Sequence, residues 1–228
     1  MKFSTKPSRR EMILGCIYLS LYLAVLPWLI PMLARFLLPQ LNAAQVNFLF
    51  FALNFAALTL ILRKFIRRSL GDALKVPGST LWCAILGYLG TQTLGGIVAQ
   101  FILRIEPEFA NVNDMNVNAL VAENFGLMAM GIVVLGPITE ELLFRGLLFR
   151  GLYDRSPLAA YLVSMVLFSL IHITGYIGFY PPNMLLLCFL QYLPAAYCLN
   201  FAYRRSGTIT APILTHMLVN LAALSAMR

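Results

Sequence analysis

The chain has 228 residues, of which 60% are hydrophobic and only 11% are charged, and its mean hydropathy is +0.80. Soluble domains are nearer half apolar and a quarter charged, so this composition excludes an ordinary soluble protein. Several apolar runs approach or exceed the ~20 residues needed to cross ~30 Å of hydrocarbon. The sequence therefore predicts an all-α, polytopic transmembrane helical bundle.

The net charge of +8 follows the expected membrane topology and does not indicate nucleic-acid binding. Basic residues gather in segments that would lie on one side of the membrane: Lys2, Lys6, Arg9, Arg10, Arg63, Lys64, Arg67, Arg68, Lys75, Arg150, Arg155, Arg204 and Arg205. Only Arg35, Arg104 and Arg228 would lie opposite. Thirteen against three is the positive-inside pattern, which predicts a cytoplasmic N-terminus.

The first half of the chain predicts three spans. The first covers residues 11–36, where Pro27 and Pro31 are expected to kink the helix, and the second covers 46–65. The following segment 66–78 is expected to be a short amphipathic connection on the cytoplasmic surface.

The third span, residues 80–104, contains four glycines and the run Thr91-Gln92-Thr93, which favours close packing in the bundle interior. Residues 105–118 are rich in Asn, Asp and Glu and are predicted to form an external loop. A fourth helix is expected from Ala119 to Tyr153. Gly136-Pro137 should kink or break that helix, because proline removes a backbone hydrogen bond and crowds the preceding turn.

Three more spans are expected. The first follows the turn centred on residue 156 and ends near Ile173, the second covers 184–203, and the third covers 208–226. The total is seven to eight helices, depending on whether the break at Pro137 counts. We expect a single integral-membrane domain over residues 1–228, with N-terminal spans in 1–118 and a catalytic core in 119–226. The expected location is a bacterial or archaeal-type cell membrane.

The polar residues of the predicted spans fall at one depth. Glu140 and His172 lie 16 residues on either side of the turn centred on residue 156, which places both about 20–24 Å along their helices. His216 lies about 16 Å, and Asn220 about 22 Å, beyond Arg205 on the last helix by the same rise. Structural polar residues on separate helices have no need to share a depth, so this layer indicates a site.

Two adjacent carboxylates in an apolar span are costly and indicate function. Glu141 stands four residues before Arg145, the favourable order for an ion pair, so Arg145 is expected to neutralise and fix Glu141. A helix N-terminus created by Pro137 would further favour the charged carboxylates. Glu140, on another face, then remains available as a general base.

The two histidines and the amide complete this chemistry. His172, at the depth of Glu140, could hold the same water. His216 and Asn220 are four residues apart on one helix face, and both can donate to a developing oxyanion.

Two other chemistries remain open at this point. Glu140, His172 and His216 are acceptable zinc ligands, although no H-E-x-x-H spacing supports a metal. A serine nucleophile would be Ser164 or Ser169, but the sequence has no G-x-S-x-G.

Three motifs resemble a known family, the CPBP family, also called the Abi or type II CAAX prenyl endopeptidase family. They are Glu140-Glu141-x-x-x-Arg145, Phe168-x-x-x-His172 and His216-x-x-x-Asn220, in that order within residues 120–225. The resemblance implies an intramembrane endopeptidase with a conical or cavity-forming catalytic core. It also implies that a peptide, or the C-terminal segment of a possibly prenylated protein, is the substrate.

The resemblance implies roles for the motif residues as well. Those matching Glu140 and His172 activate water, those matching His216 and Asn220 stabilise the oxyanion, and Glu141 supports them together with Arg145 and Phe168. The expected mechanism uses no cofactor, and a zinc-dependent mechanism is the alternative. Bacterial members of the family are also tied to bacteriocin immunity, so a non-catalytic immunity or peptide-binding protein is the alternative function. A proton-coupled transporter is disfavoured, because no internal repeat is present.

Overall fold

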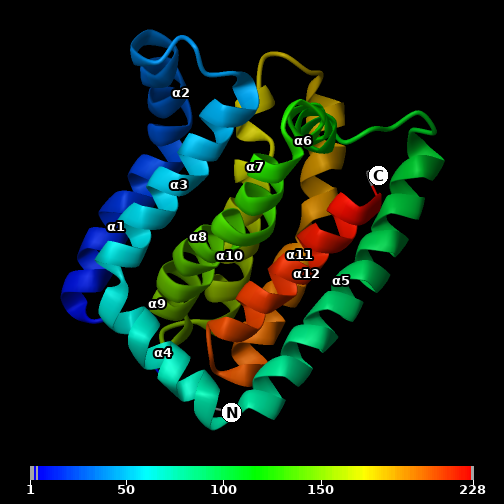
Figure 1. Cartoon of the computed structure of the whole chain (residues 1–228). Helices are drawn as coiled ribbons and strands as arrows, with labels where there is room; N and C mark the ends of the chain where they lie inside the picture. The colour runs from blue at the N-terminus through cyan, green and yellow to red at the C-terminus, as the bar shows by residue number, and fades with distance from the viewer. Residues whose placement is uncertain (1–2, 4, 227–228) are drawn as a thin grey trace.

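The computed structural model describes residue 3 and residues 5–226, and it is a bundle of helices (Figure 1). The chain begins with α1 (Arg9–Ala24) and α2 (Leu26–Leu37), which are bent by 67° relative to each other. Pro27 occupies the first turn of α2, where its missing N–H costs no hydrogen bond. The expected kink is therefore confirmed just ahead of Pro27, whereas Pro31 lies inside an uninterrupted α2.

The next helices are α3 (Ala43–Ile61), α4 (Arg63–Lys75) and α5 (Pro77–Ile105). In α4 the buried residues Phe65, Ser69 and Ala73 recur every four positions, so one face packs on the bundle and the opposite face is polar. The short amphipathic connection predicted between the second and third spans is thus a helix that starts slightly earlier than expected.

Helix α5 lies at the edge of the bundle, beside α11 (Pro182–Ser206) and α12 (Thr210–Ala226), and not in its interior as expected (Figure 1). Only one face is packed: a Cβ at Gly87 would lie 2.7 Å from Thr215 Oγ1. Around Gly95 and Gly96, in contrast, no side chain comes close enough to meet a Cβ. The small residues therefore mediate close packing at Gly87 and at Gly90, where a Cβ would lie 3.1 Å from Cys198 Sγ, and the opposite face is exposed.

The external loop predicted over 105–118 is wrong, because α6 (Val112–Glu123) occupies its second half. The Asn111 side chain accepts hydrogen bonds from the backbone N–H groups of the first turn and so begins the helix. The next helix starts at Phe125, and not at Ala119, after a second asparagine cap at Asn124. A sequence rich in Asn and Asp has the composition of a loop, but here it supplies helix caps.

Residues Phe125–Tyr153 form one continuous helical segment of 29 residues. It comprises α7 (Phe125–Met130), a π-helical stretch (Gly131–Leu135), α8 (Gly136–Glu141), a second π-helical stretch (Leu142–Phe149) and α9 (Arg150–Tyr153). Of the kink or break expected at Gly136-Pro137, the break is absent, because the helical segment continues through these residues. The wider π-helical turn before Pro137 accommodates the proline, so no free helix N-terminus stands beside Glu140.

The remaining elements are α10 (Pro157–Ile171), a 3₁₀ turn (Thr174–Tyr176), α11 and α12. Within the described part of the chain, four helical segments are long and apolar enough to span a membrane, or five if the bent pair α1–α2 counts as one. Helices α10 and α12, with 15 and 17 residues, reach about 22–26 Å, which is less than the ~30 Å hydrocarbon core. The predicted bundle is confirmed, but seven to eight spans are not.

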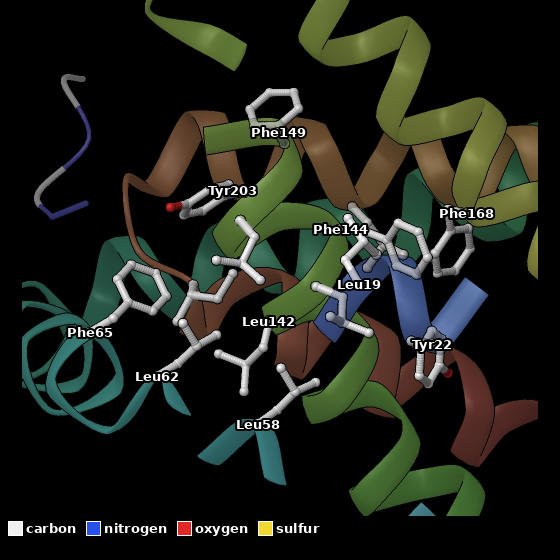
Figure 2. Packing of buried hydrophobic residues seen from close by; sticks show 14 of the residues in the cluster. Leu19, Tyr22, Leu58, Leu62, Phe65, Leu142, Phe144, Phe149, Phe168 and Tyr203 are labelled. Carbon is white, nitrogen blue, oxygen red and sulfur yellow. The ribbon is translucent and has the colours of Figure 1, made fainter. Parts of the chain in front are cut away.

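The segment Phe125–Tyr153 runs through the middle of the bundle, between α3 on one side and α12 on the other (Figure 1). The largest buried cluster surrounds its second half. Leu142 and Phe144 contribute from the central segment, Leu58 from α3, Phe168 from α10 and Tyr203 from α11 (Figure 2). Every one of these helices therefore positions the side chains described next.

Candidate active site

The centre of the site is a buried ion pair within one helical segment. Arg145 Nη1 donates to Glu141 Oε1 at 3.1 Å, and both side chains are completely inaccessible to solvent. The pair joins α8 to the π-helical stretch that follows it. The structure thus brings Glu141 and Arg145 together as the sequence predicts.

The remaining faces of the Arg145 guanidinium are also occupied. Nε donates to Asn200 Oδ1 at 3.1 Å, and Nη2 donates to the carbonyl of Ala196 at 3.0 Å, both on α11. The Phe168 ring covers the guanidinium, with Cζ 4.4 Å from the ring centroid. Arg145 is therefore fixed by three elements, and it holds Glu141 in place.

His216, on α12, binds the same carboxylate oxygen from another direction. Its Nδ1 lies 2.9 Å from Glu141 Oε1, and a carboxylate can only accept, so Nδ1 carries a proton. The other ring nitrogen, Nε2, lies 4.0 Å from Glu140 Oε2. Glu141 therefore sets the orientation of an imidazole that points toward Glu140.

Glu140 differs from its neighbour in its contacts. Its side chain is 13% exposed, whereas that of Glu141 is fully buried. Within the described residues, Oε2 of Glu140 and Oε2 of Glu141 are both buried without a hydrogen-bond partner. The two carboxylates differ at the other oxygen and in exposure, because Glu141 Oε1 is held by a cation and an imidazole and its side chain is closed to solvent.

His172 lies one residue beyond the end of α10 and not within a span as expected. Its Nδ1 is 2.8 Å from the carbonyl of Phe168, so this nitrogen donates. Its ring packs on Phe168 at 4.9 Å and stacks on Tyr192 at 4.2 Å. Phe168 also contacts His216 at 5.7 Å, so one aromatic ring joins both imidazoles to Arg145.

Asn220, one turn after His216, is partly buried. Its Nδ2 donates to the carbonyl of Ile132 at 2.7 Å, in the first π-helical stretch. That contact leaves a second N–H on the same amide nitrogen. Asn220 therefore ties α12 to the central segment close to where Pro137 interrupts regular α-helical bonding.

Sequence reasoning missed two residues that support the site. Asn200 and Ser164 are completely buried, and Ser164 Oγ lies 3.1 Å from Asn200 Oδ1, the oxygen that also accepts from Arg145. Ser164 was considered as a nucleophile, but the structure places it in this support and not beside an imidazole. A lone asparagine in the apolar run of α11 was the available signal for Asn200.

The described residues contain no group of three or more His, Cys, Asp or Glu that could hold a metal ion. The zinc ligands considered from the sequence were Glu140, His172 and His216. The Nδ1 atoms of His172 and His216 are engaged by the Phe168 carbonyl and by Glu141, which leaves Nε2 of each ring and the carboxylate of Glu140 as the atoms that a metal would use. Zinc therefore stays the alternative that the sequence left open.

The fold and the site together define a class: a multi-pass helical membrane protein with a buried carboxylate–imidazole centre. Residues 122–222 match the family model described as "Type II CAAX prenyl endopeptidase Rce1-like". This segment is similar to that family, as its three motifs predict, and the similarity points to a peptidase that acts on protein substrates at the membrane. A search of curated proteins and a search of solved structures each found no match.

Proposed function

We propose that this protein is an intramembrane endopeptidase in which Glu140 activates the water that attacks the peptide bond. The observation that carries the proposal is the contrast between the two carboxylates. Glu141 Oε1 accepts from both Arg145 and His216 and its side chain is completely buried, whereas Glu140 is 13% exposed and its Oε2 lies 4.0 Å from His216 Nε2. Oε2 of each carboxylate is buried without a hydrogen-bond partner among the described residues, so the distinction rests on the ion pair and on exposure. A general base must be within reach of water and not neutralised by a cation, and Glu140 meets this condition better than Glu141.

In the proposed reaction Glu140 removes a proton from water as the water oxygen bonds to the carbonyl carbon. The C=O π bond opens, and its electron pair moves onto oxygen to form a tetrahedral oxyanion. Collapse of this intermediate breaks the C–N bond, and the leaving amine takes the proton back from Glu140. Atoms and charge balance with one water consumed for each peptide bond cleaved.

His172 suits the task of holding the water. Because its Nδ1 donates to the Phe168 carbonyl, the neutral ring carries its lone pair on Nε2. A lone pair at that position accepts a hydrogen bond from water and leaves the oxygen lone pair available for attack. The burial of this ring among Phe168 and Tyr192 favours the neutral form that the role requires.

His216 and Asn220 are the proposed oxyanion donors. Since His216 Nδ1 already donates to Glu141, Nε2 donates to the oxyanion when the ring is an imidazolium. Asn220 has one N–H left after its bond to the Ile132 carbonyl. Both donors stand on α12, one turn apart.

The proposed substrate is a peptide or the C-terminal segment of a membrane-associated protein, and prenylation would add an apolar anchor. No cofactor is required by this mechanism. The proposed orientation has a cytoplasmic N-terminus, because thirteen basic residues then lie inside and three outside.

Cleavage-site mass spectrometry in lipid nanodiscs tests the proposal. A library of prenylated and unprenylated membrane-associated peptides is incubated with the wild type, with Glu140→Gln, and with Glu106→Gln as a control in an exposed loop. The proposal predicts new peptide termini with the wild type and the control, but none with Glu140→Gln. Peptides that bind to the wild type without being cut would instead support a peptide-binding or immunity protein.

A further inference from the structure

His172 needs an external support, because it lies beyond the last residue of α10 and no helix fixes its ring. Two contacts fix the ring on one side: the bond from Nδ1 to the Phe168 carbonyl and the packing against the Phe168 ring. On the other side stands Tyr192 of α11, whose ring is stacked on the imidazole at 4.2 Å with only 24° between the planes. The imidazole is therefore held between Phe168 and Tyr192.

Tyr192 is itself held at its phenolic oxygen. Asn113 Nδ2 donates to Tyr192 Oη at 3.0 Å. The hydroxyl proton is directed to Asp114 Oδ1 at 3.0 Å or to Asn111 Oδ1 at 3.3 Å. All three partners belong to the start of α6, so Tyr192 cannot swing away from the imidazole without losing hydrogen bonds at its phenolic oxygen.

The start of α6 is in turn fixed to α11. Asn111 caps α6 and donates from Nδ2 to Gln191 Oε1 at 2.8 Å, one residue before Tyr192. Tyr176, in the turn that follows His172, donates to Asn113 Oδ1 at 3.4 Å. The amide side chains of Asn111 and Asn113 thus connect α6 to α11 and to the turn that follows His172. Residues 111–114 lie outside the segment 122–222 that matches the family model.

From this arrangement we propose that Tyr192 is a positioning residue for His172, held in place by the Asn111–Asp114 turn at the start of α6. The inference rests on the proposed function, in which His172 holds the attacking water. Tyr192 does not touch the water or the substrate; it fixes the plane of the imidazole and thereby the direction of the Nε2 lone pair. A displacement of about 1 Å in such a group is enough to cost on the order of 10²-fold in rate.

The chain offers a spectroscopic test that does not depend on activity. His172 and His216 are the only two histidines, so a protein labelled with ¹³C and ¹⁵N at histidine gives two sets of ring signals. His172→Gln and His216→Gln assign them. A ring stacked face to face lies in the shielding cone of its neighbour, so the His172 ring protons are expected upfield of their position in an unstructured peptide.

Three variants separate positioning from packing. Tyr192→Leu removes the stack, and Tyr192→Phe keeps the ring but removes the phenolic oxygen. Tyr197→Leu is the matched control, because it makes the same change on the same helix at a ring that contacts Tyr161 and neither histidine. For each protein the histidine spectrum, the thermal midpoint, kcat and KM are measured in nanodiscs.

Tyr192→Leu is expected to move the His172 signals downfield, leave those of His216 in place and lower kcat about 10–100-fold with little change in KM. Tyr192→Phe should lie between Tyr192→Leu and the wild type, and Tyr197→Leu should match the wild type in all but stability. A Tyr192→Leu protein with shifted His172 signals but wild-type kcat would overturn the inference. So would a loss of kcat that Tyr197→Leu reproduces at equal stability. If instead Glu140→Gln cleaves normally, the proposed function fails, whatever Tyr192 does.

Discussion

Glu141 Oε1 accepts hydrogen bonds from two side chains at once, from Arg145 Nη1 at 3.1 Å and from His216 Nδ1 at 2.9 Å. One buried oxygen thereby connects the central helical segment to α12. It fixes the tautomer of His216 and directs Nε2 toward Glu140. The two adjacent acidic residues thus have different tasks: the second carboxylate orients His216, and the chemistry is proposed for the first.

The Glu141–Arg145 pair should be strongly coupled. Glu141→Leu leaves a buried guanidinium without its counterion, and Arg145→Met leaves a buried carboxylate, so each change should destabilise the protein by about 3–5 kcal/mol. The double variant removes both charges and should cost clearly less than the sum of the two single changes. Reversible unfolding of all four proteins in detergent measures the coupling. Additive effects would mean that the pair contributes no interaction.

Phe168 should matter for activity beyond its contribution to packing. It contacts Arg145 as a cation–π partner and packs on both imidazoles, so Phe168→Leu removes a desolvated interaction of about 2 kcal/mol and loosens His172 and His216. Phe65→Leu is the control, since Phe65 is also completely buried but belongs to α4 and contacts neither imidazole in the described ring contacts. At comparable loss of thermal stability, only Phe168→Leu should lower kcat. Equal activities would contradict the expected coupling to the site.

Asn220 should be needed for turnover as well as for structure. Asn220→Ala removes the bond to the Ile132 carbonyl, which costs about 1–3 kcal/mol, and also removes the proposed oxyanion donor, which costs about 10²–10³-fold in kcat. Asn54→Ala is a close control, because Asn54 is a buried amide that donates to the Phe50 carbonyl on α3. The control should lose similar stability and keep its kcat. A kcat for Asn220→Ala as high as that of Asn54→Ala would remove Asn220 from the oxyanion site.

Metal should not be required. The expected result is no stoichiometric zinc in the purified protein by elemental analysis, and unchanged cleavage after incubation with a strong chelator. Added zinc is also expected not to stimulate cleavage, because in the proposed mechanism Glu140, and not a metal ion, activates the water. Stoichiometric zinc, together with activity that the chelator removes and zinc restores, would replace the proposed mechanism with a metal-dependent one.

Helix geometry predicted both the helical bundle and which side chains approach one another in the candidate site. Spacing on helices of constant rise placed Glu140, His172 and His216 at one depth, and the structure joins the two histidines through Phe168. The order of charges predicted the Glu141–Arg145 pair. Both inferences depend only on helix geometry, which is the same wherever the helix lies.

The incorrect predictions concern residue types that are compatible with two different local structures. Pro137 could break the helix, or the helix could continue through it by means of π-helical turns, and the sequence around Pro137 does not distinguish these two outcomes. Asn111 and Asn124 could belong to a loop or cap a helix, and here they cap α6 and α7. Contacts between distant elements, such as Tyr192 on His172, leave no periodic signal in the sequence.

The central claim is that Glu140 performs the chemistry while Glu141 orients the site, and one comparison tests it directly. The measurement is kcat for a single identified peptide in nanodiscs, with the thermal midpoint recorded for the same samples of wild type and Glu140→Gln. We predict a thermal midpoint equal to or above that of the wild type, because a neutral amide replaces a buried carboxylate oxygen that lacks a partner among the described residues. We also predict a kcat at least about 10²–10⁴-fold lower. A folded Glu140→Gln protein that cuts the same bond at the wild-type rate would contradict the account.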